Sequence, residues 1–317
     1  MERHIATVGI LGTGTIGASW ATFFASKGLQ VKMYDIAAPV LSSGYEKALS
    51  NLEAMADFGL IDRSGLPAMK EAIRTCISQD ELAIGSDYIQ ESVAETYEVK
   101  RIVYRGLDKA ASAEAILASS SSGLLMSEIQ KACSRPERCL IAHPFNPPHL
   151  VPLVELVPGA ATDPAIISWA KGFFESLDKI PVVLKKEAPG HIANRLASAL
   201  WREAIDLVQK GVASVEDVDK ALFAGPGIRW AFMGQHLIYH LGGGETGGMG
   251  YFIDHVGKAF GAYWKEMATW SEISPETRQM LIDGVTEEMG DRTFKEIAQW
   301  RDSKLVELLK IIYSAKK

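Results

Sequence analysis

Short apolar runs alternate with helix-like patterns through the first half of the chain. Such runs predict buried strands, and apolar residues three or four apart predict amphipathic helices between them. This alternation is typical of a parallel sheet with helices on both faces. The predicted strands are Val8–Leu11, Val31–Tyr34, Tyr88–Gln90, Ala115–Ala118 and Cys139–Ala142, with Leu153–Val157 and Pro181–Leu184 at the sheet edge.

The stretch from Ala38 to Ser78 interrupts this alternation because it is longer than one ordinary connection between strands. Its apolar residues recur at helical spacing from Leu41 to Met55 and again near Leu66–Ile73. The stretch therefore predicts a helical hairpin inserted after the second strand.

The pattern changes near Pro189-Gly190, and the remaining chain is helical almost to its end. An amphipathic run from Asn194 to Lys210 opens this part. Ser214 and Ser274 predict further helix starts, because a serine hydroxyl accepts hydrogen bonds from the free N–H groups of a first turn. We predict two domains: an α/β doubly wound domain over 1–188, which includes the hairpin, and an all-α domain over 189–317.

Composition narrows the class of protein. The 317 residues are 47% hydrophobic and 23% charged, which is ordinary for a globular protein, and the net charge of −6 argues against nucleic acid or an anionic membrane as a partner. No apolar stretch approaches a membrane span, and we expect no signal peptide, because Met1–His4 run directly into the first predicted strand. Cys76, Cys133 and Cys139 lack metal-ligand spacing, so we expect reduced thiols, no bound metal and a cytoplasmic location.

A glycine-rich turn, Gly12-x-Gly14-x-x-Gly17, lies between the first predicted strand and a helical pattern. In this context the three glycines permit a tight turn, close approach of the backbone to a pyrophosphate, and close packing of helix on strand. The free N–H groups of the helix then favour phosphate. The turn predicts a Rossmann-type dinucleotide site, the alternative being a glycine-rich surface turn. Its expected cofactor contacts are Gly12, Gly14, Thr15, Ile16 and Gly17.

Asp35 ends the second predicted strand, eighteen residues after Gly17. A carboxylate at this place accepts hydrogen bonds from the ribose hydroxyls and repels a 2′-phosphate. No arginine follows directly, so NAD is the expected cofactor rather than NADP. Lys32, in the same strand, is expected to face solvent.

His143 lies at the carboxyl end of a predicted strand, which is where ligands bind in an open parallel sheet. Imidazole suits the removal of a hydroxyl proton near neutral pH. The turn at Asn146-Pro147-Pro148 returns the chain and brings Glu155 back on the next strand, where a carboxylate can orient the imidazole. The alternative is a structural histidine that closes a strand. His149 is expected to be solvated.

These motifs together resemble the 3-hydroxyacyl-CoA dehydrogenase superfamily. The resemblance covers most of the chain, and its combination of motifs is more specific than any one of them: Gly12–Gly17, Asp35, Ser92–Glu95, Ala118–Ser122, His143–Pro147, Glu155 and Pro189–Arg195. It implies a two-domain homodimer that oxidises an L-3-hydroxy group with NAD, with His143 catalytic and Glu155 orienting it. It also implies that Ser122 and Asn194 bind substrate and that Glu95 and Lys100 line the cofactor site.

Each of these residues also has a plainer interpretation. Ser122 can cap a helix, Asn194 can begin one, and Glu95 can act as a first-turn acid that stabilises a helix dipole. The sequence departs from the superfamily pattern at Ser120-Ser121, Pro144 and His191. These departures concern the pocket, and they put an acyl-CoA substrate in doubt rather than the reaction.

The segment Gly225–Gly234, with Arg229, Trp230 and Phe232, resembles a branch of the superfamily that holds carnitine and gulonate dehydrogenases. Aromatic faces hold quaternary ammonium groups, and the second half offers Trp230, Phe232, Tyr239, Tyr251, Phe252, Tyr263 and Trp264. Either Arg229 or Arg195 is able to hold a carboxylate. For Arg229 the alternative is an ion pair across a dimer, and for the aromatic residues it is ordinary core or interface packing.

The sequence therefore predicts NAD-dependent oxidation of the 3-hydroxyl of L-carnitine. The alternatives from the same chemistry are L-gulonate and a short L-3-hydroxyacyl-CoA. A non-enzymatic alternative is a crystallin-like structural protein or an NAD(H) redox sensor, neither of which needs His143, Glu155, Ser122 and Asn194 together. The expected partners are a small-molecule substrate and a second copy of the chain, joined through the helical domain.

Overall fold

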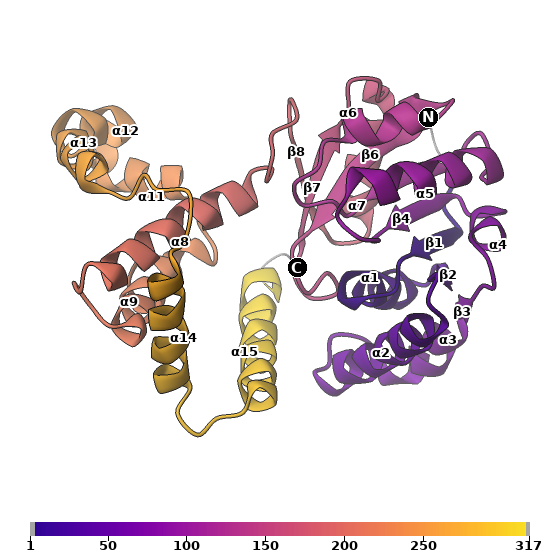
Figure 1. Ribbon diagram of the computed structural model, residues 1–317, viewed down its shortest axis with the longest axis horizontal. Coiled ribbons are helices and arrows are strands. Elements are labelled where there is room, and N and C mark those ends of the chain that lie inside the picture. Colours follow the sequence, from indigo (N-terminus) through magenta and orange to yellow (C-terminus); the bar gives the residue numbers. More distant parts are fainter. Residues whose placement is uncertain (1–3, 315–317) are drawn as a thin grey trace. The chain divides into compact units, whose positions relative to one another are not determined.

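The computed structural model describes residues 4–314 (Figure 1). Contacts between residues divide the chain into two units, the first ending at Arg195 and the second beginning at Leu196. The first unit is built on a sheet, and the second is helical. The helix α8 (Ala193–Gln209) carries the chain from one unit to the other.

Within residues 4–314, eight strands form one sheet in the order β3-β2-β1-β4-β5-β6-β7-β8. Neighbouring strands are parallel except β6 and β7, which are antiparallel. The strand order reverses between β1 and β4, so the crevice at their carboxyl ends is the expected ligand site of such a sheet. The strands are β1 (Thr7–Leu11), β2 (Gln30–Tyr34), β3 (Ile73–Thr75), β4 (Tyr88–Glu91), β5 (Ile116–Ser119), β6 (Cys139–Pro144), β7 (Leu153–Pro158) and β8 (Ile180–Val183).

Two features of the sheet differ from the sequence-based expectation. Ile73 was assigned to a helix end, but it begins β3, which pairs with β2 from Val31 to Met33. A three-residue strand shows no period of its own, so only the neighbouring strand defines it. The antiparallel β6–β7 pair also departs from the expected parallel sheet, since a short turn rather than a helix joins these two strands.

Helices cover both faces of this sheet (Figure 1). The segment after β2 contains the predicted hairpin as α2 and α3. The helices of the first unit are α1 (Thr15–Ser26), α2 (Ala38–Asp57), α3 (Leu66–Glu71), α4 (Gln79–Ala83), α5 (Tyr97–Ala110), α6 (Met126–Ile129) and α7 (Pro164–Ser176).

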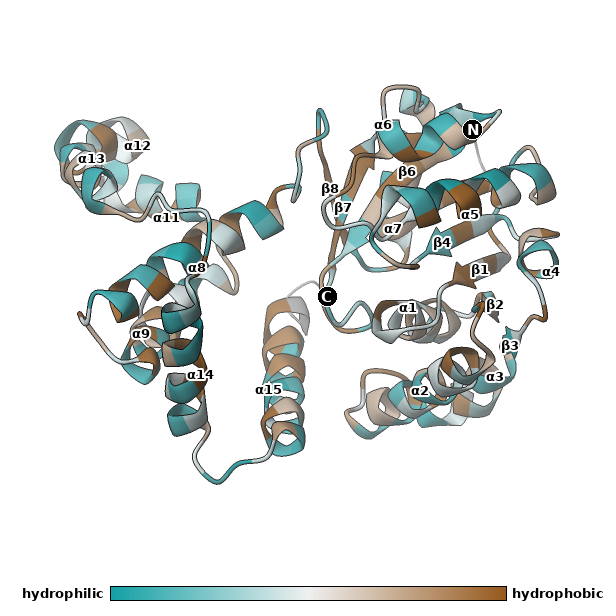
Figure 2. Ribbon diagram, viewed as in Figure 1, coloured by the Kyte–Doolittle hydropathy of each residue, from teal (hydrophilic) through white to brown (hydrophobic). Residues whose placement is uncertain are grey.

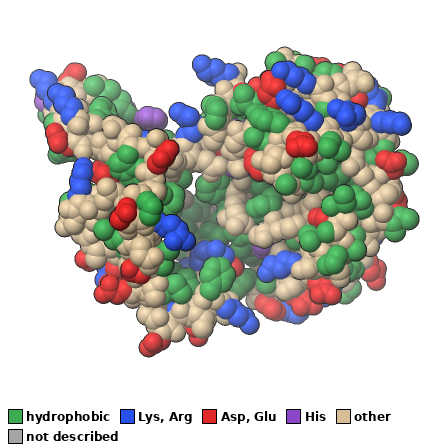
Figure 3. Space-filling view, in the orientation of Figure 1, with side chains coloured by type: hydrophobic (Ala, Val, Ile, Leu, Met, Phe, Trp, Pro, Cys, Tyr) green, Lys and Arg blue, Asp and Glu red, His purple; other side chains and the backbone are tan. Residues whose placement is uncertain are grey.

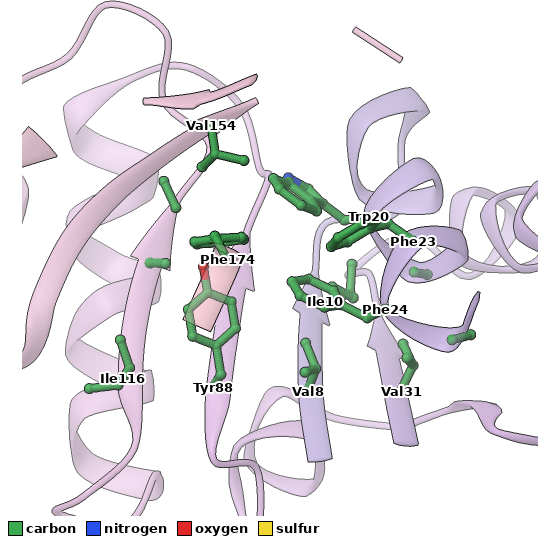
Figure 4. Packing of buried hydrophobic residues seen from close by; sticks show 14 of the residues in the cluster. Val8, Ile10, Trp20, Phe23, Phe24, Val31, Tyr88, Ile116, Val154 and Phe174 are labelled. Atoms are coloured by element: carbon green, nitrogen blue, oxygen red, sulfur yellow. The ribbon is translucent and has the colours of Figure 1, made fainter. Parts of the chain in front are cut away.

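The core consists of two clusters, one on each face, because successive strand residues point to opposite sides. Tyr88 joins the first cluster, whereas its neighbour Ile89 joins the second. Figure 4 shows aromatic rings gathered on the first face, where Trp20 and Phe24 stack with centroids 5.3 Å apart and Phe174 lies 5.9 Å from Trp20. The hydropathy colours of Figure 2 follow the same division, with apolar strands inside and polar outer surfaces on α2 and α5.

Lys32 corrects one expectation about β2. Its side chain is buried rather than solvent-facing, and its amine donates hydrogen bonds to the carbonyls of Glu81 and Ile84. These carbonyls belong to the end of α4, where free acceptors and the helix dipole favour a cation. The packing of α4 over this face therefore decides the environment of Lys32.

The second unit is helical throughout its described residues. Ser214 and Ser274 cap α9 and α14 as predicted, since their hydroxyls accept hydrogen bonds from the N–H groups of Asp217 and Thr277. Its remaining helices are α9 (Val215–Leu222), α10 (Ile228–Trp230), α11 (Gln235–Gly242), α12 (Gly244–His255), α13 (Gly257–Glu266), α14 (Pro275–Met289) and α15 (Phe294–Ser314). Among the described residues, no helix has the length and apolarity needed to cross a membrane.

Candidate functional site

The glycine turn joins β1 to α1 and has the geometry expected of a phosphate cradle. Gly12 has φ +86°, and a Cβ there would lie 2.6 Å from the backbone of Ser92. At Gly17 a Cβ would lie 1.8 Å from the carbonyl oxygen of Gly12. Gly14, in contrast, has open space on that side, and no side chain caps the N-terminus of α1. The turn thus fits a dinucleotide pyrophosphate, held by Gly12–Gly17 with the exposed Thr15 and half-buried Ile16 at the helix start.

Asp35 follows β2 and is held in place by main-chain donors. Its Oδ2 accepts the N–H of Thr13 at 2.9 Å, and its Oδ1 accepts the N–H of Ala37 at 3.0 Å. The half-buried carboxylate is thus fixed beside the glycine turn with acceptor capacity left on both oxygens. A carboxylate held at this place is suited to accept hydrogen bonds from the ribose hydroxyls of NAD.

Replacing Asp35 with serine is expected to raise the KM for NAD roughly tenfold to a hundredfold, as a lost hydrogen bond to a charged group predicts. Use of NADP is expected to rise at the same time, because the repelling charge is gone. Initial rates with each cofactor measure both effects. Asp87→Ser is the matched control, since Asp87 also accepts two main-chain N–H groups, of Ala6 and Thr7, at the opposite end of β1. An unchanged ratio of NAD to NADP use in Asp35→Ser would contradict this assignment.

His143 and Glu155 face each other across the antiparallel pair of β6 and β7. Side chains at directly opposed positions share one face of a sheet, which is why the two groups meet. The Nδ1–H of His143 donates to Oε2 of Glu155 at 2.9 Å. This bond leaves the lone pair of the neutral ring on Nε2, so Nε2 is the atom able to accept a proton.

The second oxygen of Glu155 holds the start of α8. Oε1 accepts the N–H groups of Ile192 and Ala193 at 2.8 and 2.9 Å. Burial would raise the pKa of the Glu155 carboxyl, but the hydrogen bonds from His143 and from these two N–H groups outweigh it and lower the pKa. Glu155 is therefore ionised at neutral pH, and its carboxylate accepts the hydrogen bond from His143.

A serine-rich turn follows β5 and is held by Glu95. Oε1 of Glu95 accepts the hydroxyl of Ser121 at 2.6 Å and the N–H groups of Ser122 and Gly123 at 2.9 and 3.1 Å. Among residues 4–314 the Ser122 hydroxyl has no hydrogen-bond partner, although the residue is half-buried. Ser122 thus has a fixed backbone and a hydroxyl that is not used within the protein.

Lys100 is almost fully buried, with 1% of its side chain exposed. Its amine lies 2.7 Å from Oε1 of the buried Glu91 and 3.3 Å from Oε2 of Glu95. The family resemblance implies that Lys100 lines the cofactor site. In the structure its amine bridges the carboxylates of Glu91 and Glu95. The contacts place Lys100 behind the serine turn, since Ser119 also donates to Glu91 at 2.6 Å.

Asn194 belongs to the first turn of α8, one residue beyond the N–H groups that Glu155 holds. It is half-buried, and no hydrogen bond of its side chain occurs within the described part of the chain. Glu155 therefore joins His143 to the start of the helix that carries Asn194, and all of these residues lie within the first unit.

The connection from β6 to β7 is anchored to α1 at two places. His149 is not simply solvated as expected, because its Nδ1 lies 2.7 Å from the hydroxyl of Ser19. Lys179, just before β8, donates to the carbonyls of Pro148 and Val151. The Lys179 amine also lies 4.2 Å from the ring centroid of Phe23. The sequence offered no signal for this buried amine, because its partners lie far away in the chain.

The pKa of Lys179 falls from 10.5 to about 7, first because of burial and second because of the charge on Lys27. Between these pH values the unfolded chain keeps a proton that the folded protein has released, so the free energy of unfolding rises with pH by at most roughly 1.4 kcal/mol per unit. Lys179→Met removes this gain. As the pH rises from 7 to 10, the free energy of unfolding of Lys179→Met is expected to fall relative to that of the native protein. Urea unfolding measures this difference.

Lys171→Met on α7 is the matched control, because the Lys171 amine is half-exposed and pairs with Glu175. It is expected to show no such change with pH. A difference between Lys179→Met and the native protein that stays constant over this range would contradict the assignment.

The predicted substrate residues of the helical unit lie on and beside α10. Arg229 is exposed, Trp230 and Phe232 are 36% and 65% exposed, and no described residue forms an ion pair with Arg229. Tyr239 and Phe252 instead stack on each other, with ring centroids 4.6 Å apart. Of these aromatic residues, Trp230 and Phe232 therefore keep more surface available for a ligand.

The glycine cradle with Asp35 and the His143–Glu155 pair on one sheet define a dinucleotide-dependent dehydrogenase. The sequence model of the 3-hydroxyacyl-CoA dehydrogenase NAD binding domain matches residues 7–188, and that of the C-terminal domain matches residues 190–283. The chain belongs to the 3-hydroxyacyl-CoA dehydrogenase family. It is an NAD-dependent 3-hydroxy dehydrogenase, which confirms the fold, the cofactor and the family predicted from the sequence.

Relatives and solved structures agree with this assignment. L-carnitine dehydrogenase of Pseudomonas sp. is 38% identical over 99% of this chain and 96% of its own length, and that of Oceanobacillus iheyensis is 38% identical over 96% and 97%. The structure of 5-formyl-3-hydroxy-2-methylpyridine 4-carboxylic acid 5-dehydrogenase has a TM-score of 0.82 at 27% identity, covering 98% of this chain and 99% of that one. That of 3-hydroxybutyryl-CoA dehydrogenase from Escherichia coli has a TM-score of 0.69 at 27% identity, covering 89% and 57%.

Proposed function

We propose that this enzyme oxidises the 3-hydroxyl group of L-carnitine to give 3-dehydrocarnitine. The observation that carries the substrate is the similarity, over nearly the whole chain, to proteins named L-carnitine dehydrogenase. The His143–Glu155 pair supports the reaction, since a base with an orienting carboxylate is what hydroxyl oxidation requires. NAD, when bound, supplies the hydride acceptor.

In the proposed reaction, Nε2 of His143 takes the proton of the substrate hydroxyl. Glu155 keeps the ring in the correct tautomer and stabilises the imidazolium that forms. The hydroxyl of Ser122 and the amide of Asn194 hold the reacting oxygen. Neither group has a hydrogen-bond partner among residues 4–314, which supports this role.

The helical unit is proposed to recognise the two charged ends of carnitine. Arg229 would hold the carboxylate, because a guanidinium matches a carboxylate in charge and geometry. Trp230 and Phe232 would hold the trimethylammonium group, because aromatic faces attract a cation that cannot donate hydrogen bonds. Their exposure supports this proposal.

We also propose a homodimer formed through the helical unit. This unit exposes many large apolar side chains, some of them visible as green patches in Figure 3, and a contiguous exposed apolar surface marks an interaction site. They include Trp201 at 60%, Tyr263 at 60%, Trp264 at 66%, Phe294 at 83% and Trp300 at 61%. Light scattering after size-exclusion chromatography tests this, and a monomer at micromolar concentration would contradict it.

The test of the substrate is NADH formation by the purified enzyme with L-carnitine, D-carnitine, L-gulonate and 3-hydroxybutyryl-CoA side by side. We expect oxidation of L-carnitine and little activity on the other three compounds. Activity on the CoA ester alone would overturn the proposed substrate while leaving the reaction type intact.

A further inference from the structure

His191 lies beside His143 in the connection from β8 to α8, and it is 1% exposed. Its backbone has φ +51°, a left-handed conformation that residues other than glycine adopt uncommonly, and Gly190 before it has φ +76°. Such a conformation persists only where surrounding contacts hold it. The contacts made by His191 therefore indicate which role its strained backbone serves.

Three segments of the site meet at His191. Its Nε2 lies 2.9 Å from the carbonyl oxygen of Ser121, and because a carbonyl only accepts, Nε2 carries the hydrogen. Its ring centroid lies 5.1 Å from that of His143, with the planes inclined by 56°. The next two N–H groups along the chain bind Glu155, as described above. His191 thus touches the serine turn and the catalytic pair, and it directly precedes the turn that carries Asn194.

The other ring nitrogen of His191 lowers the stability of the fold. Nδ1 of His191 is buried and has no hydrogen-bond partner among the described residues. An unpaired buried polar atom is destabilising, and a purely apolar ring would avoid it.

We propose that His191 is a positioning residue for the oxidation of the 3-hydroxyl group. Its Nε2–H fixes the Ser121–Ser122 turn against the ring of His143, while its backbone leads into the turn that carries Asn194. His191 thereby sets the separation between the base and the two groups that hold the reacting oxygen. It touches no substrate itself, and the proposal rests on the roles proposed for Ser122 and Asn194.

Two properties of the His191 side chain can be tested separately by substitution: its hydrogen-bond donor and its ring. His191→Gln keeps a donor near the position of Nε2 and loses the ring, whereas His191→Phe keeps the ring and loses the donor. One hydrogen bond lost from the placement of reacting groups predicts a kcat about tenfold lower in His191→Phe. His191→Gln is expected to recover most of this loss, and the KM for NAD is expected to stay unchanged in both variants.

The assay uses L-carnitine and its C3-deuterated form, with His4→Phe as a control for the same substitution at an exposed position. A larger isotope effect in His191→Phe places the loss in hydride transfer, and thermal unfolding checks that the variants fold. Equal kcat in both variants would overturn the proposal, and so would a loss of stability with unchanged kcat and isotope effect.

A second measurement separates this proposal from the substrate assignment. In imidazole ¹⁵N spectra of the full-length protein with NAD, the Nδ1–H signal of His143 is expected to move further in His191→Phe than the loss of the neighbouring ring moves it in His191→Gln. If the native protein oxidises none of the four compounds, the proposed substrate fails, and these spectra still decide the role of His191. A His143 signal identical in all three proteins would overturn it.

Discussion

His143→Asn is expected to lower kcat for L-carnitine oxidation about a thousandfold, since general-base catalysis contributes roughly 10²- to 10⁴-fold. The asparagine amide occupies the place of Nδ1 and can still donate to Glu155, so the carboxylate keeps a partner. Only the Nε2 lone pair is removed. Steady-state kinetics measure the loss, and NAD affinity from NADH fluorescence is expected to stay unchanged, because the cradle lies on another strand.

His149→Asn is the matched control for this prediction. It makes the same chemical change in the connection that follows β6, where the ring binds Ser19 rather than Glu155. Most of the activity is expected to remain. If His143→Asn kept more than a tenth of the native kcat, another group would have to take the proton and the proposed reaction would be wrong.

Lys100→Met is expected to lower the free energy of unfolding by roughly 3–5 kcal/mol, because removing one partner leaves a buried charge uncompensated. The charge left behind is that of Glu91, whose side chain is 0% exposed. Urea unfolding measures the change. The double variant Glu91→Gln/Lys100→Met removes both charges at nearly constant volume and is expected to restore much of the stability.

The double variant also tests whether Lys100 touches the cofactor. If Lys100 does not touch NAD and only supports the turn held by Glu95, the double variant is expected to bind NAD with nearly native affinity. A large rise in the Kd for NAD in a double variant of native stability would instead assign Lys100 a direct contact, as the family resemblance implied.

Local signals in the sequence were sufficient to predict the glycine turn and NAD as the cofactor. Gly12, Gly14 and Gly17 act through their own backbone conformation and through contacts with their neighbours, and Asp35 ends the strand next to them. A strand, a turn and a helix in succession constrain one another locally. For the same reason the main strands and the caps of α9 and α14 are predictable from local sequence.

The pairing of His143 with Glu155 was only partly predictable. The prolines after His143 indicated that the chain returns, and Glu155 was the acid expected on the returning strand. The sequence did not indicate antiparallel pairing, in which residues 143 and 155 are directly opposed. One step in register would have moved Glu155 to the other face of the sheet.

The sequence by itself determined the fold class, NAD as the cofactor and the family, because these depend on short motifs and on periodicity. Only the tertiary structure decided that Lys32 and Lys179 are buried, that Lys100 joins two carboxylates, and that His191 lies against His143. The partners of these groups are mostly distant in sequence, as Ser121 is from His191 and Pro148 is from Lys179. A titratable group takes its burial and hydrogen bonds from such neighbours, and only the folded chain brings them together.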